Sequence, residues 1–295
     1  MSTRVVAVGD SLSCGEGVGI HVAPDQTWAA QLTASIPAAG LTQLSVAGAR
    51  LCDVIDHQLP QALACRPDLA TVLVGLNDII RAGFGPDRFR ADLIALVHAL
   101  SATGATVLVA TLHDPGWTRP VPLTPRLRRH LGERVAIVND AVRDAVRDLA
   151  DGRIRLLDVA RIGDLCHLGA WEVDRVHPSP AGHRLIAAAA VQALHGTDLP
   201  TPAPLPRHPM PLPAGRLARA SWMLTCGIPW LVQHGGWVAP AAFAMGFDGS
   251  TRGEPVHGGH DRGAIQPAAV HPPLRRAYSG FGEHAGEPEV ARAFG

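Results

Sequence analysis

Short apolar runs alternate with longer segments of helical period between residues 4 and 195. Five such runs are bounded by turn-forming residues and lie at 4–9, 41–47, 69–75, 105–111 and 154–159. Apolar runs of this length predict strands that are buried on both faces of a parallel sheet.

Between these runs, apolar residues recur at helical spacing. One stripe consists of Phe89, Leu93, Leu96 and Leu100 behind Pro86, a second covers 135–149, and a last helix is expected from about 180 to 194. The alternation of strands and helices predicts an α/β protein. We expect a flavodoxin-like three-layer α/β/α sandwich around a five-stranded parallel sheet, formed by residues 1–196.

The composition changes at Gly196, where a Pro-rich C-terminal extension begins. Seven prolines between residues 200 and 213 predict a stiff, extended linker at 197–215. The apolar segment 216–237 could be a lid, a membrane-surface anchor or a short docking segment on the domain itself, and its low charge favours docking. Residues 238–295 lack sustained periodicity and are predicted to be disordered.

Composition narrows the possible partners. The formal net charge is zero, with 26 basic and 26 acidic residues, which gives no reason to expect nucleic acid or an anionic membrane as a partner. The five cysteines form no Cys-x-x-Cys pair, so neither a metal site nor another cofactor is expected. Neither a signal peptide nor an integral membrane segment is apparent. We therefore expect a cytoplasmic protein, and its oligomeric state stays open.

Ser11 follows the first predicted strand in the motif Gly-Asp-Ser-Leu at 9–12, where a sharp turn can expose its hydroxyl. A hydroxyl is a good nucleophile only when a base lies within hydrogen-bond reach, and an acceptor must fix the tautomer of that base. Asp174 and His177, three residues apart before the last helix, can supply this pair. Taken singly, each motif is more simply a turn or a helix cap.

Two further motifs offer hydrogen-bond donors. Asn77, in Gly-Leu-Asn-Asp at 75–78, carries a side-chain amide that can donate to a developing oxyanion, and Gly48 presents an unhindered backbone N–H. Each of these, taken alone, is again more simply a turn. Because the carboxyl ends of parallel strands share one edge of a sheet, the four motifs are predicted to converge. Together they supply the groups that acyl transfer requires.

In combination these motifs resemble the SGNH/GDSL hydrolases, whose four blocks occur here in order within residues 4 to about 195. The resemblance implies that Ser11 attacks an acyl carbon, with His177 as base and Asp174 as the group that orients it. It also implies an oxyanion hole formed by the N–H groups of Ser11 and Gly48 and the Asn77 side chain. The family usually has Asn five residues before the glycine, where this chain has Gln43, and we expect this difference to affect local turn support.

The activity expected from the resemblance is cleavage of a small-molecule, lipid or glycan ester through an acyl-enzyme. One alternative is an acyltransferase or deacetylase acting on a glycan or small metabolite. Another is a catalytically silent binding module of the same fold, which the intact set of motif residues disfavours. Cys14, near Ser11, is expected to be a small buried apolar group, and His183 a structural residue of the last helix.

Overall fold

The computed structural model describes residues 2–81, 83–114, 118 and 124–233 of the 295-residue chain. These residues fall within one compact unit, Met1–Gly249. A second unit, Ser250–Gly295, lies outside the described residues. The predicted tail at 238–295 and the last four positions of the 216–237 segment also lie outside them, so the disorder expected there stays a prediction.

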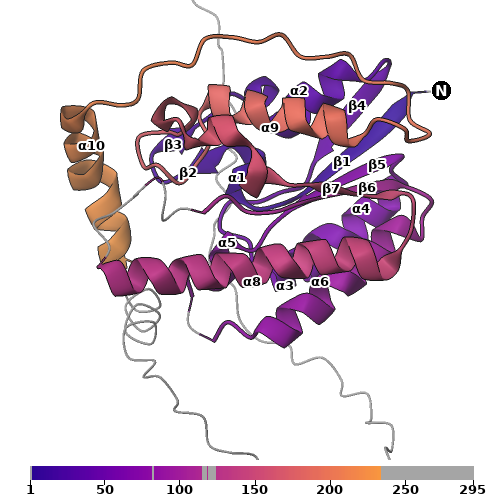
Figure 1. The fold of residues 1–295 in the computed structure, drawn as a ribbon, viewed down its shortest axis with the longest axis horizontal. Coiled ribbons are helices and arrows are strands. Elements are labelled where there is room, and N and C mark those ends of the chain that lie inside the picture. Colours follow the sequence, from indigo (N-terminus) through magenta and orange to yellow (C-terminus); the bar gives the residue numbers. More distant parts are fainter. Residues whose placement is uncertain (1, 82, 115–117, 119–123, 234–295) are drawn as a thin grey trace, which may run out of the picture. The chain divides into compact units, whose positions relative to one another are not determined.

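Five parallel strands form the central sheet in the order β4-β1-β5-β6-β7 (Figure 1). Their bounds are Thr3–Gly9 for β1, Ala39–Gln43 for β4, Leu69–Leu73 for β5, Thr106–Ala110 for β6 and Ile154–Leu157 for β7. Every residue of β5 and β6 is buried, as expected for strands covered on both faces. The order is the 2-1-3-4-5 order of flavodoxin-like folds, and the predicted fold class is confirmed.

The edge strand β4 differs from its predicted bounds of 41–47. It begins at Ala39 and ends at Gln43, and all five residues pair with β1. None of its residues is fully buried, and Val46 beyond it is 59% exposed. An edge strand that is open to solvent lacks the continuous apolar run of a central strand, so the pattern placed its bounds wrongly.

Helices cover both faces of the sheet (Figure 1). Helices α2 (Trp28–Ser35) and α9 (Pro180–Ala193) pack together on one face, and α6 (Pro86–Ser101) and α8 (Pro125–Leu149) pack together on the other. The shorter elements there are α3 (Leu51–Asp53), a π-helical turn at Val54–Gln58 and α4 (Leu59–Cys65). Helix α8 begins ten residues before the predicted segment at 135–149, because Thr124 caps it through Leu127 N–H.

A two-stranded antiparallel hairpin follows α1 (Ser11–Cys14) at the carboxyl edge of the sheet. Its strands, β2 (Glu16–Gly17) and β3 (Ile20–His21), have two residues each. Strands this short carry no periodic signal, which explains why the sequence did not predict them. Short 3₁₀ turns lie at Pro24–Gln26, Val159–Arg161, Gly163–Cys166 and Leu168–Ala170.

The Pro-rich stretch at 197–215 is extended and lies against the domain. The Ala203 N–H donates to the Ser35 carbonyl oxygen at 2.7 Å, and Leu199, Leu205 and Met210 pack against the core. Helix α10 (Arg216–Trp222) follows and continues into a π-helical turn at Met223–Gly227. None of the helices in the described part of the chain has the length and hydropathy needed to cross a bilayer.

Candidate active site

Ser11 stands at the carboxyl end of β1, at the first position of α1. Gly9 ends the strand with φ of +144°, and a Cβ at this position would collide with the Leu73 carbonyl oxygen, so only glycine fits. The buried Gln58 amide holds both polar groups of Gly9, accepting from its N–H at 2.8 Å and donating to its carbonyl at 2.9 Å. Asp10 caps α1 through Leu12 N–H at 2.9 Å.

Three predicted residues form one line of hydrogen bonds. Ser11 Oγ lies 2.9 Å from His177 Nε2, and His177 Nδ1 lies 2.5 Å from Asp174 Oδ2. The second oxygen of Asp174 accepts from the backbone N–H groups of Val176 and His177 at 2.9 and 3.0 Å. All three side chains of the line are buried. Such a line can deprotonate a hydroxyl and hold the resulting imidazolium.

The turn that carries Asp174 and His177 is tightly fixed. Arg175 between them has φ of +61°, which is uncommon for a residue other than glycine. Its carbonyl oxygen accepts from Thr118 Oγ1 at 2.6 Å, and the His177 carbonyl accepts from Glu172 N–H at 2.9 Å. The loop thus presents both side chains toward Ser11 just before α9 begins.

The predicted donors Asn77 and Gly48 gather at the same edge of the sheet. Asn77, in α5 (Leu76–Ile79), donates through Nδ2 to the Ala49 carbonyl at 3.1 Å and to Asp10 Oδ2 at 3.4 Å. Gly48 has φ of +81°, and its carbonyl accepts from Arg81 at 3.1 Å. The structure therefore brings all four motifs together.

Gln43 supports the turn near Ser11. Its amide nitrogen donates to the Ser13 carbonyl at 3.3 Å, and its amide oxygen accepts from Ser45 Oγ at 2.8 Å. The first bond connects the end of β4 with α1, and the second holds the amide in place from the loop that follows β4. A longer amide side chain than the Asn usual in the family thus holds this part of the edge together.

Burial perturbs several ionisable groups around Ser11. It raises the pKa of Asp10 to about 7, opposed by the hydrogen bond from Leu12 and by the charge of His177. It also raises the pKa of Asp78 to about 6, opposed by the hydrogen bond from Leu51 N–H. Burial likewise raises the pKa of the Cys14 thiol, which disfavours a reactive thiolate there.

His183 is completely buried in α9, and its Nδ1 accepts from Trp28 N–H at 3.1 Å. Burial, assisted by the charge of His177, lowers the pKa of His183 from 6.5 to about 3. Between pH 6.5 and about 3, the imidazole of His183 is therefore protonated in the unfolded chain and neutral in the folded chain. Its contribution to stability is complete above pH 6.5 and is lost as the pH falls toward 3.

We therefore expect His183→Asn to flatten the acid limb of the stability curve. An Asn oxygen can replace Nδ1 as acceptor but does not take up the proton. The free energy of unfolding, measured by urea denaturation between pH 7 and 4, should fall less steeply in the variant, by up to about 1.4 kcal/mol per pH unit. The other titrating groups are the same in both proteins, so their contributions cancel when the two free energies of unfolding are subtracted. If the two free energies fell in parallel with pH, the imidazole of His183 would not be buried and neutral.

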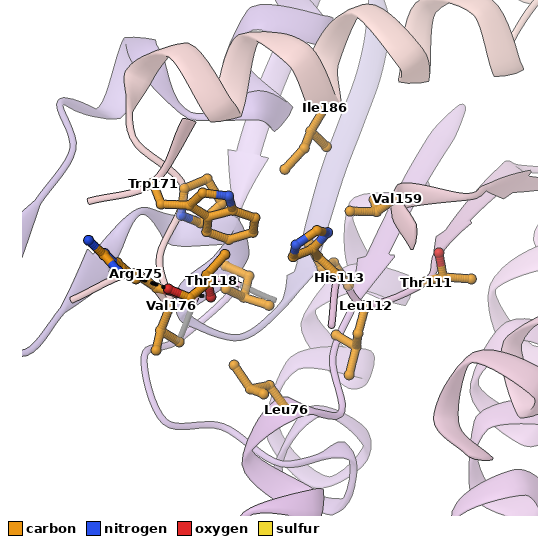
Figure 2. A pocket seen from close by; sticks show the side chains of 13 residues that line it. Leu76, Thr111, Leu112, His113, Thr118, Val159, Trp171, Arg175, Val176 and Ile186 are labelled. Carbon is orange, nitrogen blue, oxygen red and sulfur yellow. Dashed lines mark hydrogen bonds between the residues drawn. The ribbon is translucent and has the colours of Figure 1, made fainter. Parts of the chain in front are cut away.

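An apolar pocket adjoins this site, and Figure 2 shows its side chains. It is lined by Leu12, Leu73, Leu76, Thr111, Leu112, His113, Thr118, Val159, Trp171, Arg175, Val176, Pro178 and Ile186. The His113 ring lies on Trp171 with centroids 4.7 Å apart, and its Nε2 has no hydrogen-bond partner within the described part of the chain. Burial lowers the pKa of His113 and thereby favours the neutral ring.

Sequence reasoning missed three residues near the site: His113, Gln58 and Gly17. His113 had a usable signal, because it follows the predicted strand at 105–111 at the catalytic edge. Gln58 acts through its contact with Gly9, and Gly17 through its contact with His177. Neither contact could be predicted from the spacing of residues along the chain. Among the described residues, no group of three or more His, Cys, Asp or Glu side chains is placed to hold a metal ion.

A doubly wound parallel sheet with Ser, His and Asp side chains in one hydrogen-bonded line at its carboxyl edge has the architecture of an α/β hydrolytic enzyme. Residues 7–185, more than half of the chain, match the GDSL-like lipase/acylhydrolase family, and the chain belongs to this family. It is a GDSL-type hydrolase that acts on esters. No curated protein shows significant sequence similarity to it.

Solved structures share the fold at low sequence identity. A lipolytic G-D-S-L protein from Veillonella parvula DSM 2008 has 19% identity and a TM-score of 0.51, covering 67% of this chain and 100% of its own. TesA has 20% identity and a TM-score of 0.51, with 65% and 98% covered. A variant of Axe2, an acetyl xylan esterase from Geobacillus stearothermophilus, has 18% identity and a TM-score of 0.51, with 70% and 99% covered.

Proposed function

We propose that the protein cleaves carboxylic esters through a covalent acyl-enzyme formed on Ser11. The observation that carries this proposal is the unbroken line from Ser11 Oγ through His177 to Asp174. As Oγ attacks the acyl carbon, His177 Nε2 takes the hydroxyl proton. The proton then passes to the departing alcohol when the tetrahedral intermediate collapses. Water, activated by the same nitrogen, releases the acid in the second half of the reaction.

The oxyanion of both tetrahedral intermediates is proposed to accept from three donors: the backbone N–H groups of Ser11 and Gly48 and the amide of Asn77. The Asn77 bond to the Ala49 carbonyl supports this set, because it holds the amide plane with one of the two amide hydrogens. The second hydrogen, in a long contact of 3.4 Å with Asp10, is the one proposed to turn to the oxyanion. Donors fixed before the reaction stabilise developing charge without reorganisation.

The pocket that contains His113 and Trp171 is proposed to receive the acyl group. Residues next to the site form its wall, with Leu12 beside Ser11, Leu76 beside Asn77, and Val176 beside His177. Most of the lining is aliphatic or aromatic, and the cavity of about 20 Å³ has room for a short apolar group such as the methyl of an acetyl ester, not for a long chain. We therefore favour simple carboxylic esters over strongly polar acyl groups.

The activity is tested with a panel of p-nitrophenyl esters of increasing chain length, beside acetylated sugars and thioesters, with Ser11→Ala protein as the blank. Hydrolysis of the p-nitrophenyl esters at rates above the blank is the expected result. Formation of new glycerol esters in the presence of glycerol would instead identify an acyltransferase. A silent binding module would turn over no substrate in the panel.

Replacing Ile186 by Ala tests the acyl pocket. Ile186 projects from α9 into the pocket (Figure 2), and its truncation lengthens the space for a chain. We expect the ratio of kcat/KM for hexanoate over acetate esters to rise roughly tenfold. Val191→Ala is the matched control, since Val191 is buried in the same helix but does not line the pocket. Equal ratios in the two variants would show that acyl groups bind elsewhere.

The cellular location of the protein is proposed from the redox state of its cysteines. All five cysteines lie within the described ranges and all five are free. Free thiols persist where the redox environment is reducing. We therefore propose a cytoplasmic location, which a cell fractionation with a compartment-specific marker enzyme would test.

A further inference from the structure

The imidazole of His177 is held at both ends by hydrogen bonds, and a third contact lies against its face. Gly17 of β2 packs so closely on the ring that a Cβ at position 17 would lie 2.7 Å from both Cε1 and Nδ1. Any side chain there would displace the imidazole. The backbone of the β2–β3 hairpin therefore forms a wall that keeps the ring in line with Ser11 and Asp174.

Apart from the buried side chains of Ile20 and Val22, little in this hairpin holds it in position. Each strand contributes two residues, and an isolated two-stranded ribbon is at best marginally stable in water even when longer. At its base, the Val22 N–H donates to the Gly15 carbonyl at 2.8 Å. The tip, Val18 and Gly19, lies beyond this bond and requires support from outside the hairpin.

The C-terminal extension supplies that support. Trp222 at the end of α10 donates through Nε1 to the Val18 carbonyl at 2.7 Å. Cys226 in the following π-helical turn packs on Gly19, where a Cβ would lie 2.6 Å from Sγ. Between these two residues, Leu224 points away and is 68% exposed. The helix thus presents one face to the hairpin tip, and Figure 1 shows α10 on this side of the molecule.

We propose that Trp222 is a positioning residue for catalysis: it holds the β2–β3 hairpin against the His177 imidazole, so that the C-terminal extension completes the active site. The family match ends at residue 185, and α10 lies 31 residues beyond it (216 − 185). The inference rests on the proposed role of His177 as the base. It adds a contribution from a part of the chain that the family match does not include.

The proposal is tested in the full-length chain with Trp222→Ala, and with Leu224→Ala as the matched control on the same helix. Loss of the Trp222 side chain frees the hairpin tip, so that the imidazole of His177 can move out of hydrogen-bond alignment with Ser11 and Asp174. We expect kcat for a short soluble ester to fall roughly 10- to 100-fold, the scale of a small misplacement of a catalytic group, with KM changed less than about twofold. The rate of fluorophosphonate labelling should fall in parallel, and Leu224→Ala should match the wild type.

Trp222→Phe separates the hydrogen bond from the packing and covers the case in which Trp222→Ala fails to fold. Phe keeps an aromatic ring at this position but lacks the N–H donor. We expect kcat to fall about fivefold, the factor of one ordinary hydrogen bond. An unchanged kcat in Trp222→Phe protein, together with an unchanged or unmeasurable Trp222→Ala protein, would overturn the proposal.

An engineered disulfide between position 19 and Cys226 tests whether holding the hairpin tip by another means restores activity to Trp222→Ala protein. A Cβ at position 19 would lie 3.3 Å from Cys226 Cβ, slightly below the usual separation of about 3.5–4.5 Å across a disulfide. Gly19 has φ of +67°, which strains any other residue there, so Gly19→Cys in the wild-type background serves as the control for that strain. Gly19→Cys in the Trp222→Ala background should therefore recover kcat when oxidised and lose it again with dithiothreitol. The same protein carrying Cys226→Ser should show no redox response. A confirmed disulfide without recovery of kcat, when Gly19→Cys alone keeps the wild-type kcat, would contradict the proposed role of the hairpin.

These outcomes are separable from those of the proposed function. Full activity in Ser11→Ala protein would remove the nucleophile and with it the role of His177. Inactive Ser11→Ala protein combined with wild-type kcat and labelling rate in both Trp222 variants would leave the esterase mechanism intact. In that case only the positioning role of Trp222 would be wrong.

Discussion

Ser11→Ala protein should retain its fold and lose essentially all esterase activity. The substitution removes one oxygen from a buried position and leaves His177 Nε2 without the hydroxyl it contacts at 2.9 Å. Deletion of a triad nucleophile lowers kcat by about 10⁶-fold, and the residual rate comes from binding and oxyanion stabilisation. The measurement is kcat on the best p-nitrophenyl ester, with the thermal midpoint as evidence of folding.

Ser13→Ala provides the matched control for Ser11→Ala. Ser13 lies in the same short helix, is completely buried, and its hydroxyl has no hydrogen-bond partner among the described residues. Its loss should leave kcat close to that of the wild type. Comparable kcat values in the two variants would mean that the hydroxyl of Ser11 has no special role.

The second large effect is expected for Asn77→Ala, with a fall in kcat of about 10²–10³-fold and a smaller change in KM. A donor to the oxyanion acts on the transition state, whereas ground-state binding depends mainly on the pocket. The substitution also leaves the Ala49 carbonyl without its partner at 3.1 Å, which should cost about 1 kcal/mol of stability.

Kinetics on a well-bound ester distinguish the possible roles of Asn77. If KM rises while kcat is unchanged, Asn77 binds substrate and does not stabilise the oxyanion. If kcat falls only to the extent that the folded fraction falls, its role is structural, through the bonds to Ala49 and Asp10. The thermal midpoint, measured on the same preparation, corrects for the second possibility.

The sequence predicted the topology and the convergence of the motifs for one physical reason. Parallel strands place their carboxyl ends at one edge, so short motifs after the runs at 4–9, 41–47 and 69–75 must meet there. Ser11 and Asn77 needed no further information to be brought together, whereas Gly48 lies beyond the end of β4 at Gln43 and depends also on the loop that follows the strand. Asp174 and His177 were harder to place from strands alone, and their position depends on the left-handed turn at Arg175.

The features that the sequence did not predict depend on contacts between distant residues. Trp222 and Val18 are separated by 204 positions, and Gln58 and Gly9 by 49, so no local period connects either pair. Gly17 is one of 31 glycines, and only the packed His177 ring distinguishes it. The prediction that 216–237 docks on the domain gave no partner, and the contacts of Trp222 and Cys226 with the β2–β3 hairpin join residues about 200 positions apart.

The most direct test of the acyl-enzyme mechanism is the mass of the protein after reaction with a fluorophosphonate probe, followed by peptide mapping. A single adduct on Ser11 is the predicted result, with no adduct in Ser11→Ala protein and slow labelling in His177→Ala protein. Ser13→Ala protein should be labelled at the wild-type rate. An adduct on another residue, or ester hydrolysis by protein that carries no adduct at Ser11, would contradict the account.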